Sequence, residues 1–131
     1  MRTSLQHVHA VETYGLHFTH GERTISYMPC GRFFDGLIAD YARHEPDVLI
    51  VNVLRYRDAM DVDHLTFDDV VRVLDGVRPK VAILSHFGTK MLERNPHDLA
   101  EQLENESGRR VIAARDGYRF DADIEVAAAA G

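Results

Sequence analysis

Histidine and cysteine side chains that follow short apolar runs are the residues best suited to chemistry. His86 comes directly after the run 80–85, and Cys30 comes shortly after the run 24–28. Imidazole nitrogen and thiolate sulfur both bind zinc, and imidazole also binds iron, so each residue is a candidate metal ligand. His86 also fits a general acid–base group or a hydrogen-bonded structural histidine. Cys30 also fits a small buried apolar residue.

Three further histidines are candidates for the same site. His64 stands just before a predicted helix, with aspartates nearby that could orient it as an acid–base group, although an exposed loop histidine fits equally well. His7 and His9 are two positions apart and would share one face of a strand, which makes them additional metal candidates. The other histidines are expected at the surface or at helix ends: His17, His20, His44 and His97.

Apolar periodicity predicts the elements that must position these side chains. Short apolar runs bounded by turn residues predict the strands 14–19, 24–28, 47–53, 80–85, 110–114 and 118–120. Helical spacing of apolar residues predicts the helices 32–44, 67–76 and 95–106, the second with Thr66 as its N-cap. Strands that alternate with helices predict an α/β layered domain with a partly parallel sheet.

Composition narrows the classes of function. The 131 residues fit one domain, with flexible ends expected at 1–10 and 124–131. The formal net charge is −6 without a basic block, so nonspecific nucleic-acid binding is not expected. The sequence has no apolar stretch of membrane-spanning length and no signal core. A single cysteine excludes an internal disulfide and fits a reducing compartment, so the cytoplasm is the expected location.

Five short segments carry a family resemblance: 11–16, 25–30, 47–52, 64–66 and 79–88. The last of them is similar to a ligand strand that reads Pro-Lys-x-x-Ile-Leu-Thr-His-Phe-Gly, and the fourth is similar to a His-Leu-Ser/Thr motif ahead of a helix. In this order they resemble the C-terminal half of the metallo-β-lactamase superfamily, on its phosphodiesterase and transfer-RNA-processing side. The superfamily's His-x-His-x-Asp-His motif is absent from the sequence.

The resemblance implies a fold and a set of roles. The implied fold is half of an αββα sandwich, with a mixed sheet and about three helices on one face. By position, His86 matches the last histidine ligand, Cys30 stands where a metal-bridging aspartate is usual, and His64 matches a histidine that assists the leaving group. The implied cofactor is zinc, or iron or manganese, and the alternative is that the isolated chain binds no metal.

Two functions follow from this incomplete ligand set. The chain resembles half of a metal-dependent, phosphodiester-type hydrolase whose site is completed by a partner or by the rest of a longer protein. Alternatively, it is a non-catalytic remnant or interaction module that keeps the half-fold. The sheet face that packs on the other half in full-length relatives would be bare and apolar, so we expect a homodimer through this face, or a chain that supplies the missing half.

Overall fold

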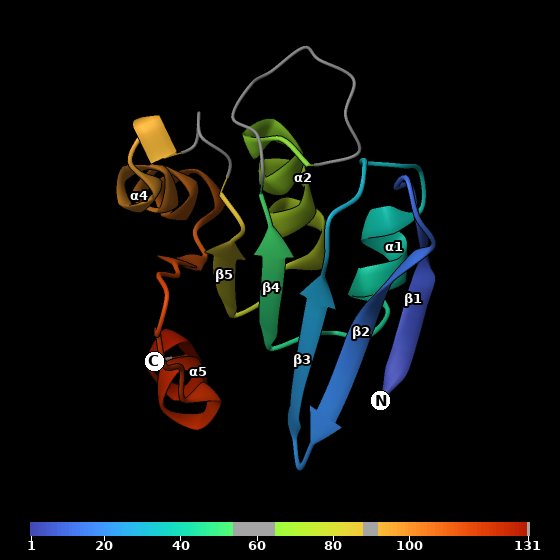
Figure 1. Cartoon of the computed structure of the whole chain (residues 1–131). Coiled ribbons are helices and arrows are strands. Elements are labelled where there is room, and N and C mark those ends of the chain that lie inside the picture. Colours follow the sequence, from blue (N-terminus) through green and yellow to red (C-terminus); the bar gives the residue numbers. More distant parts are fainter. Residues whose placement is uncertain (54–64, 88–91, 131) are drawn as a thin grey trace.

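The computed structural model describes residues 1–53, 65–87 and 92–130 (Figure 1). Its strands are β1 (Arg2–His7), β2 (Thr13–His20), β3 (Arg23–Met28), β4 (Val48–Asn52), β5 (Val81–Ser85) and β6 (Arg110–Ala113). Its helices are α1 (Leu37–Ala42), α2 (Phe67–Val77), α4 (Pro96–Ser107) and α5 (Ala122–Ala130). Among these residues, no helix has the length and apolar character that crossing a bilayer requires.

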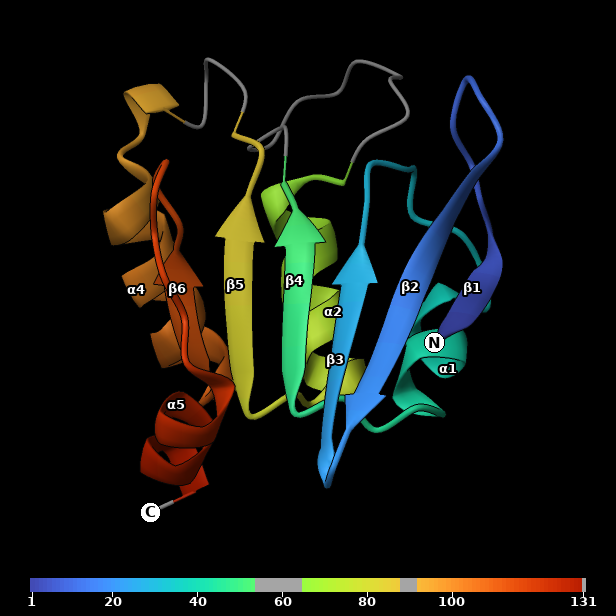
Figure 2. The same cartoon turned by 60° about the horizontal axis from the view of Figure 1, so that its bottom comes forward.

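The six strands form one mixed sheet in sequence order, β1-β2-β3-β4-β5-β6. The first three strands pair antiparallel, whereas β3, β4, β5 and β6 run parallel to one another. The carboxyl ends of the four parallel strands therefore meet at one edge of the sheet (Figure 2). In open α/β sheets this edge is where ligands bind.

Three helices, α1, α2 and α4, cover one face of the sheet (Figures 1 and 2). Their apolar sides join the inward residues of the strands in one core cluster, which includes Leu37, Leu74, Leu103, Val51 and Leu84. The start of α2 is fixed by a capping box in which Thr66 and Asp69 each accept a hydrogen bond from the other's backbone N–H. The predicted N-cap at Thr66 is confirmed.

The opposite face of the sheet is covered only in part. Helix α5 lies on this side, and its Val126 packs with Val48, Val81 and Ile83 in a second, smaller cluster. The β2 residue Phe18 remains 42% exposed. This face therefore has one half under α5 and another half open to solvent.

The predicted fold class is confirmed, with differences in single elements. The helix expected over 32–44 begins only at Leu37, because Gly36 has a φ of 95° and interrupts the helical backbone. The strand expected at 118–120 is wrong: a turn at Asp116-Gly117 leads into irregular chain, and Phe120 packs against the α5 cluster instead of pairing with a strand. The predicted turn at 116–117 is confirmed by the hydrogen bond from Tyr118 N–H to the Arg115 carbonyl.

Both ends of the chain contain regular structure. Residues 2–7 form the edge strand β1, and 122–130 form α5. Their expected flexibility stays a prediction. His17, expected at the surface, is 3% exposed. It lies on the helix-covered face because side chains alternate along β2. Gly15 and His17 face α1, whereas Phe18 faces away from it.

Candidate active site

Cys30 and His86 meet at the carboxyl edge of the sheet, although they lie 56 positions apart in the sequence. Cys30 follows β3 and His86 follows β5, so the two residues flank the end of β4. The Cys30 Sγ atom lies 2.8 Å from His86 Nδ1, which is a close thiol–imidazole hydrogen bond. The structure thus brings together the two principal ligand candidates of the sequence.

Asn52, the last residue of β4, contacts this pair through its side-chain amide. Its Nδ2 group donates a hydrogen bond to the Tyr27 hydroxyl at 3.1 Å and a longer one to the Cys30 sulfur at 3.6 Å. The sulfur therefore has an imidazole on one side and an amide N–H on another.

His86 has an unusual backbone conformation. Its φ is 61°, in the left-handed region that a side-chain-bearing residue rarely adopts. Strain of this kind is concentrated at functional sites. Directly beside the ring is a pocket of about 1000 Å³, which Tyr27, Asn52 and Ser85 line together with His86. The imidazole is exposed to this pocket, so it can reach a bound molecule.

The donor atoms fit zinc in kind but do not yet form a zinc site. Two ligands on one tetrahedral zinc ion, with Zn–S near 2.3 Å and Zn–N near 2.0 Å, have donor atoms about 3.5 Å apart. The 2.8 Å between Cys30 and His86 is shorter, so the side chains would have to separate by about 0.7 Å to share an ion. Among the described residues, no group of three or more His, Cys, Asp or Glu side chains is placed to hold a metal.

The additional candidates lie in different surroundings. His7 packs against Gly31, next to Cys30, but its Nε2 is hydrogen-bonded to the Tyr41 hydroxyl at 2.8 Å. Burial lowers the pKa of His7 to about 4, so the ring is neutral at pH 7. His9 follows β1 and is partly exposed. His64 lies outside the described residues.

Sequence reasoning missed several residues that the fold places beside the pair. Tyr27, Asn52 and Ser85 lie at or near the ends of β3, β4 and β5, and all three line the pocket. The sequence could have indicated these three residues, because polar residues at the ends of parallel strands lie together at one edge of the sheet. His97 and Arg115 line the same pocket, and nothing in their local sequence indicates this.

Comparisons with known proteins agree with this architecture. Residues 2–87 match the family model described as "Beta-lactamase superfamily domain". An uncharacterized protein of Methanocaldococcus jannaschii is 29% identical over 99 residues, which are 74% of this chain and 36% of that protein.

Solved structures extend the likeness to most of the chain. The metallo-beta-lactamase fold protein YhfI from Bacillus subtilis superposes with a TM-score of 0.72 at 19% identity, over 88% of this chain and 46% of that one. Human tRNase Z, short form, superposes with a TM-score of 0.64 at 17% identity, over 91% of this chain and 42% of that one. The chain thus spans less than half the length of these relatives. It belongs to the beta-lactamase superfamily and has the fold of about half of a metallo-beta-lactamase domain.

Proposed function

We propose that the chain supplies half of the active site of a metal-dependent hydrolase that acts on phosphate esters of the phosphodiester type. The observation that carries the proposal is the Cys30–His86 pair at the carboxyl edge of the sheet, in a chain of this superfamily. A diphosphatase of the PhnP family and human tRNase Z are among its structural neighbours, and their names support a phosphate-containing substrate.

Each residue of the pair has a defined part in this proposal. His86 and Cys30 would hold a metal ion, zinc being favoured by the nitrogen and sulfur donors and iron or manganese being the alternatives. Such an ion polarises a phosphoryl oxygen and activates water near neutral pH. Asn52 keeps the sulfur in place through its amide N–H. His64 is the proposed proton donor to the leaving group.

Two ligands are fewer than the three or four that zinc usually has in proteins. We propose that the others come from His7 or His9 after rearrangement, or from a partner chain. The cytoplasm remains the proposed location, since a reducing compartment keeps Cys30 reduced.

Metal content tests this function directly. The purified chain, dialysed against zinc, is analysed by elemental analysis beside Cys30→Ala and His86→Ala, with the exposed His20→Ala as the matched control. We expect stoichiometric zinc in the parent chain and in the control, and its loss in both site variants. A parent chain without stoichiometric zinc, iron or manganese, also in the presence of any partner that co-purifies, would contradict the proposal.

The open sheet face favours a second candidate function, an interaction module that dimerises. Phe18 is 42% exposed on this face, and the β3 and β4 residues Ile25 and Ile50 beside it are only partly buried. We propose that a second copy packs sheet on sheet against them. Light scattering at micromolar concentration should show a dimer that Phe18→Asp dissociates, whereas Val11→Asp, in an exposed turn, leaves it intact. A parent chain that is monomeric at this concentration contradicts the module.

A further inference from the structure

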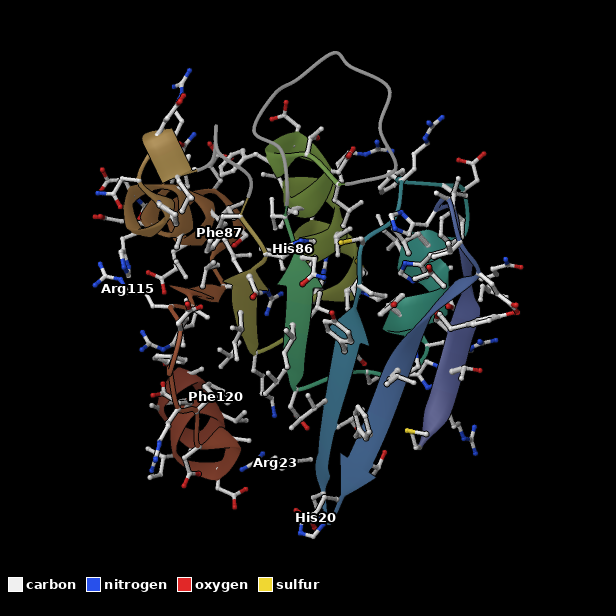
Figure 3. All side chains as sticks on the ribbon, viewed as in Figure 1. His20, Arg23, His86, Phe87, Arg115 and Phe120 are labelled. Atoms are coloured by element: carbon white, nitrogen blue, oxygen red, sulfur yellow. The ribbon has the colours of Figure 1, made fainter. Side chains whose placement is uncertain are left out.

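The pocket beside His86 extends away from the Cys30–His86 pair toward α4 and β6. Its lining includes His86 together with His97 of α4 and Arg115, which follows β6. In Figure 3, Arg115 lies at the side of the molecule, His86 lies above the central strands, and Phe87 lies between them in this view. A molecule that reacts at His86 can therefore extend as far as Arg115.

Arg115 differs from several other arginines of the described chain in its charge balance. Arg23, Arg43 and Arg110 form ion pairs with carboxylates at 3.3, 2.8 and 3.2 Å. Within the described residues, Arg115 forms no such pair, and its Nε atom instead donates a hydrogen bond to His97 Nε2 at 2.8 Å. The hydrogen bond to His97 thus orients the Arg115 guanidinium without neutralising its positive charge.

The hydrogen bond also sets the tautomer of His97. An Nε2 atom that accepts from a guanidinium cannot carry a proton, so the proton of the neutral ring lies on Nδ1. The guanidinium Nη groups and this Nδ1–H are the remaining donors of the pair. Asp116 lines the pocket too, and its carboxylate lies next in sequence to Arg115 without forming an ion pair with it in the described chain.

One part of the pocket wall is apolar. Phe87, Leu92, Ala113 and Ala114 contribute to it, and Leu92 is 59% exposed. A planar or apolar part of a ligand can cover these side chains while polar groups at its ends reach the polar part of the lining. Ligand sites commonly combine an apolar lining with a few placed polar groups.

We propose that Arg115, oriented by His97, binds a phosphate group of the substrate that is remote from the bond to be cleaved. This inference rests on the proposed function in one respect, since it takes the reacting bond to lie at His86. The substrate class is then an organic phosphate with an aromatic or apolar segment between its two ends. A guanidinium suits this role because its planar donors match phosphate oxygens.

Equilibrium binding of adenosine 5′-monophosphate tests the inference without turnover. Calorimetric titrations use the full chain, freed of metal with a chelator. We expect Arg115→Gln to weaken binding roughly ten- to hundredfold, as for a lost charge-assisted hydrogen bond, and Arg115→Lys to weaken it less. Arg119→Gln, an exposed arginine outside this pocket, should leave the affinity within about twofold. Inorganic phosphate should bind more weakly than the nucleotide, because it leaves the apolar wall uncovered.

The controls separate this site from the proposed chemistry. A chain that holds no metal but still binds the nucleotide through Arg115 would contradict the proposed function and support the inference. Equal affinities of the parent chain and Arg115→Gln overturn the inference. So does a parent chain with no saturable binding below about 10 mM.

Discussion

The imidazole rings of His17 and His44 stack on each other, with centroids 3.7 Å apart and planes inclined by 16°. Both Nε2 atoms are buried and lack a hydrogen-bond partner among the described residues. His17 Nδ1 is hydrogen-bonded to Ser26 Oγ at 2.7 Å. The His17 ring also packs edge-on against the Tyr41 ring, with centroids 4.9 Å apart. Burial, together with the neighbouring His44, lowers the pKa of His17 to about 4. The contact between α1 and the sheet is thus built around neutral imidazole.

The chain should lose stability as the pH falls from about 6.5 to about 4. His7 and His17 both have pKa values near 4 when folded and near 6.5 when unfolded, so the unfolded chain binds more protons in this window. The loss should be about 1 to 3 kcal/mol once the full linkage energy is discounted for solvent screening, and these two groups contribute little further well below pH 4. Asp40 opposes the shift of both rings, whereas Arg43 adds to that of His17. Urea unfolding at a series of pH values measures it.

The matched variants are His7→Gln with His17→Gln, and His20→Gln as the exposed control. The double variant should flatten the pH dependence between 6.5 and 4, and the control should keep it. An unchanged slope in the double variant would show that other groups cause the acid sensitivity.

Gly15→Ala should destabilise the fold strongly. An added Cβ would overlap the Tyr41 hydroxyl and would lie 2.7 Å from the Tyr27 carbonyl oxygen, which belongs to the paired strand and cannot move away alone. We expect a loss of about 1 to 3 kcal/mol in unfolding free energy. Thr19→Ala, an exposed position of the same strand, should change it by less than about 0.5 kcal/mol. Equal stability of the two variants would refute the predicted close approach.

Thr66→Ala should weaken α2 by about 1 kcal/mol, because the Asp69 N–H loses its acceptor at 3.2 Å. Thr66→Ser keeps the hydroxyl and should retain most of the stability. Chemical denaturation of the three proteins gives the comparison. A Ser variant as unstable as the Ala variant would mean that the threonine methyl group, and not the cap, is responsible.

Position 86 should accept asparagine or glycine better than valine. The φ of 61° is tolerated by asparagine and by glycine, whereas a β-branched side chain is strained there. We expect His86→Val to cost about 1 to 2 kcal/mol more than His86→Asn in thermal or chemical unfolding. The histidine would then be retained for its imidazole and not for its fit to the backbone. Equal costs for the two variants would contradict this.

The strands and helices were predictable where apolar residues alone decide them. The runs at 47–53 and 80–85 are covered by helices on one face and partly by α5 on the other, so almost every residue is apolar. Strand β1 was harder to recognise because its inward residues are Ser4 and His7, whose hydrogen bonds replace apolar burial. His17 was misplaced at the surface for the same reason.

The site was predictable only in part. A histidine after a buried strand and a cysteine after another give two ligand candidates, and parallel pairing brings them together. Their distance of 2.8 Å and the role of Asn52 depend on strand order, which local sequence does not specify. Arg115 could not be assigned at all, because its partner His97 lies 18 positions away on another element.

The strand order of the sheet has a consequence for how the chain folds during synthesis. Each strand after β1 pairs with the strand made just before it, so it finds one partner already synthesised. The sheet can grow by one strand at a time, in the order of synthesis. The antiparallel pairs among β1, β2 and β3 form the most local contacts, whereas the parallel pairs from β3 to β6 close longer connections and form more slowly, which leaves their growing edge open to other chains for longer.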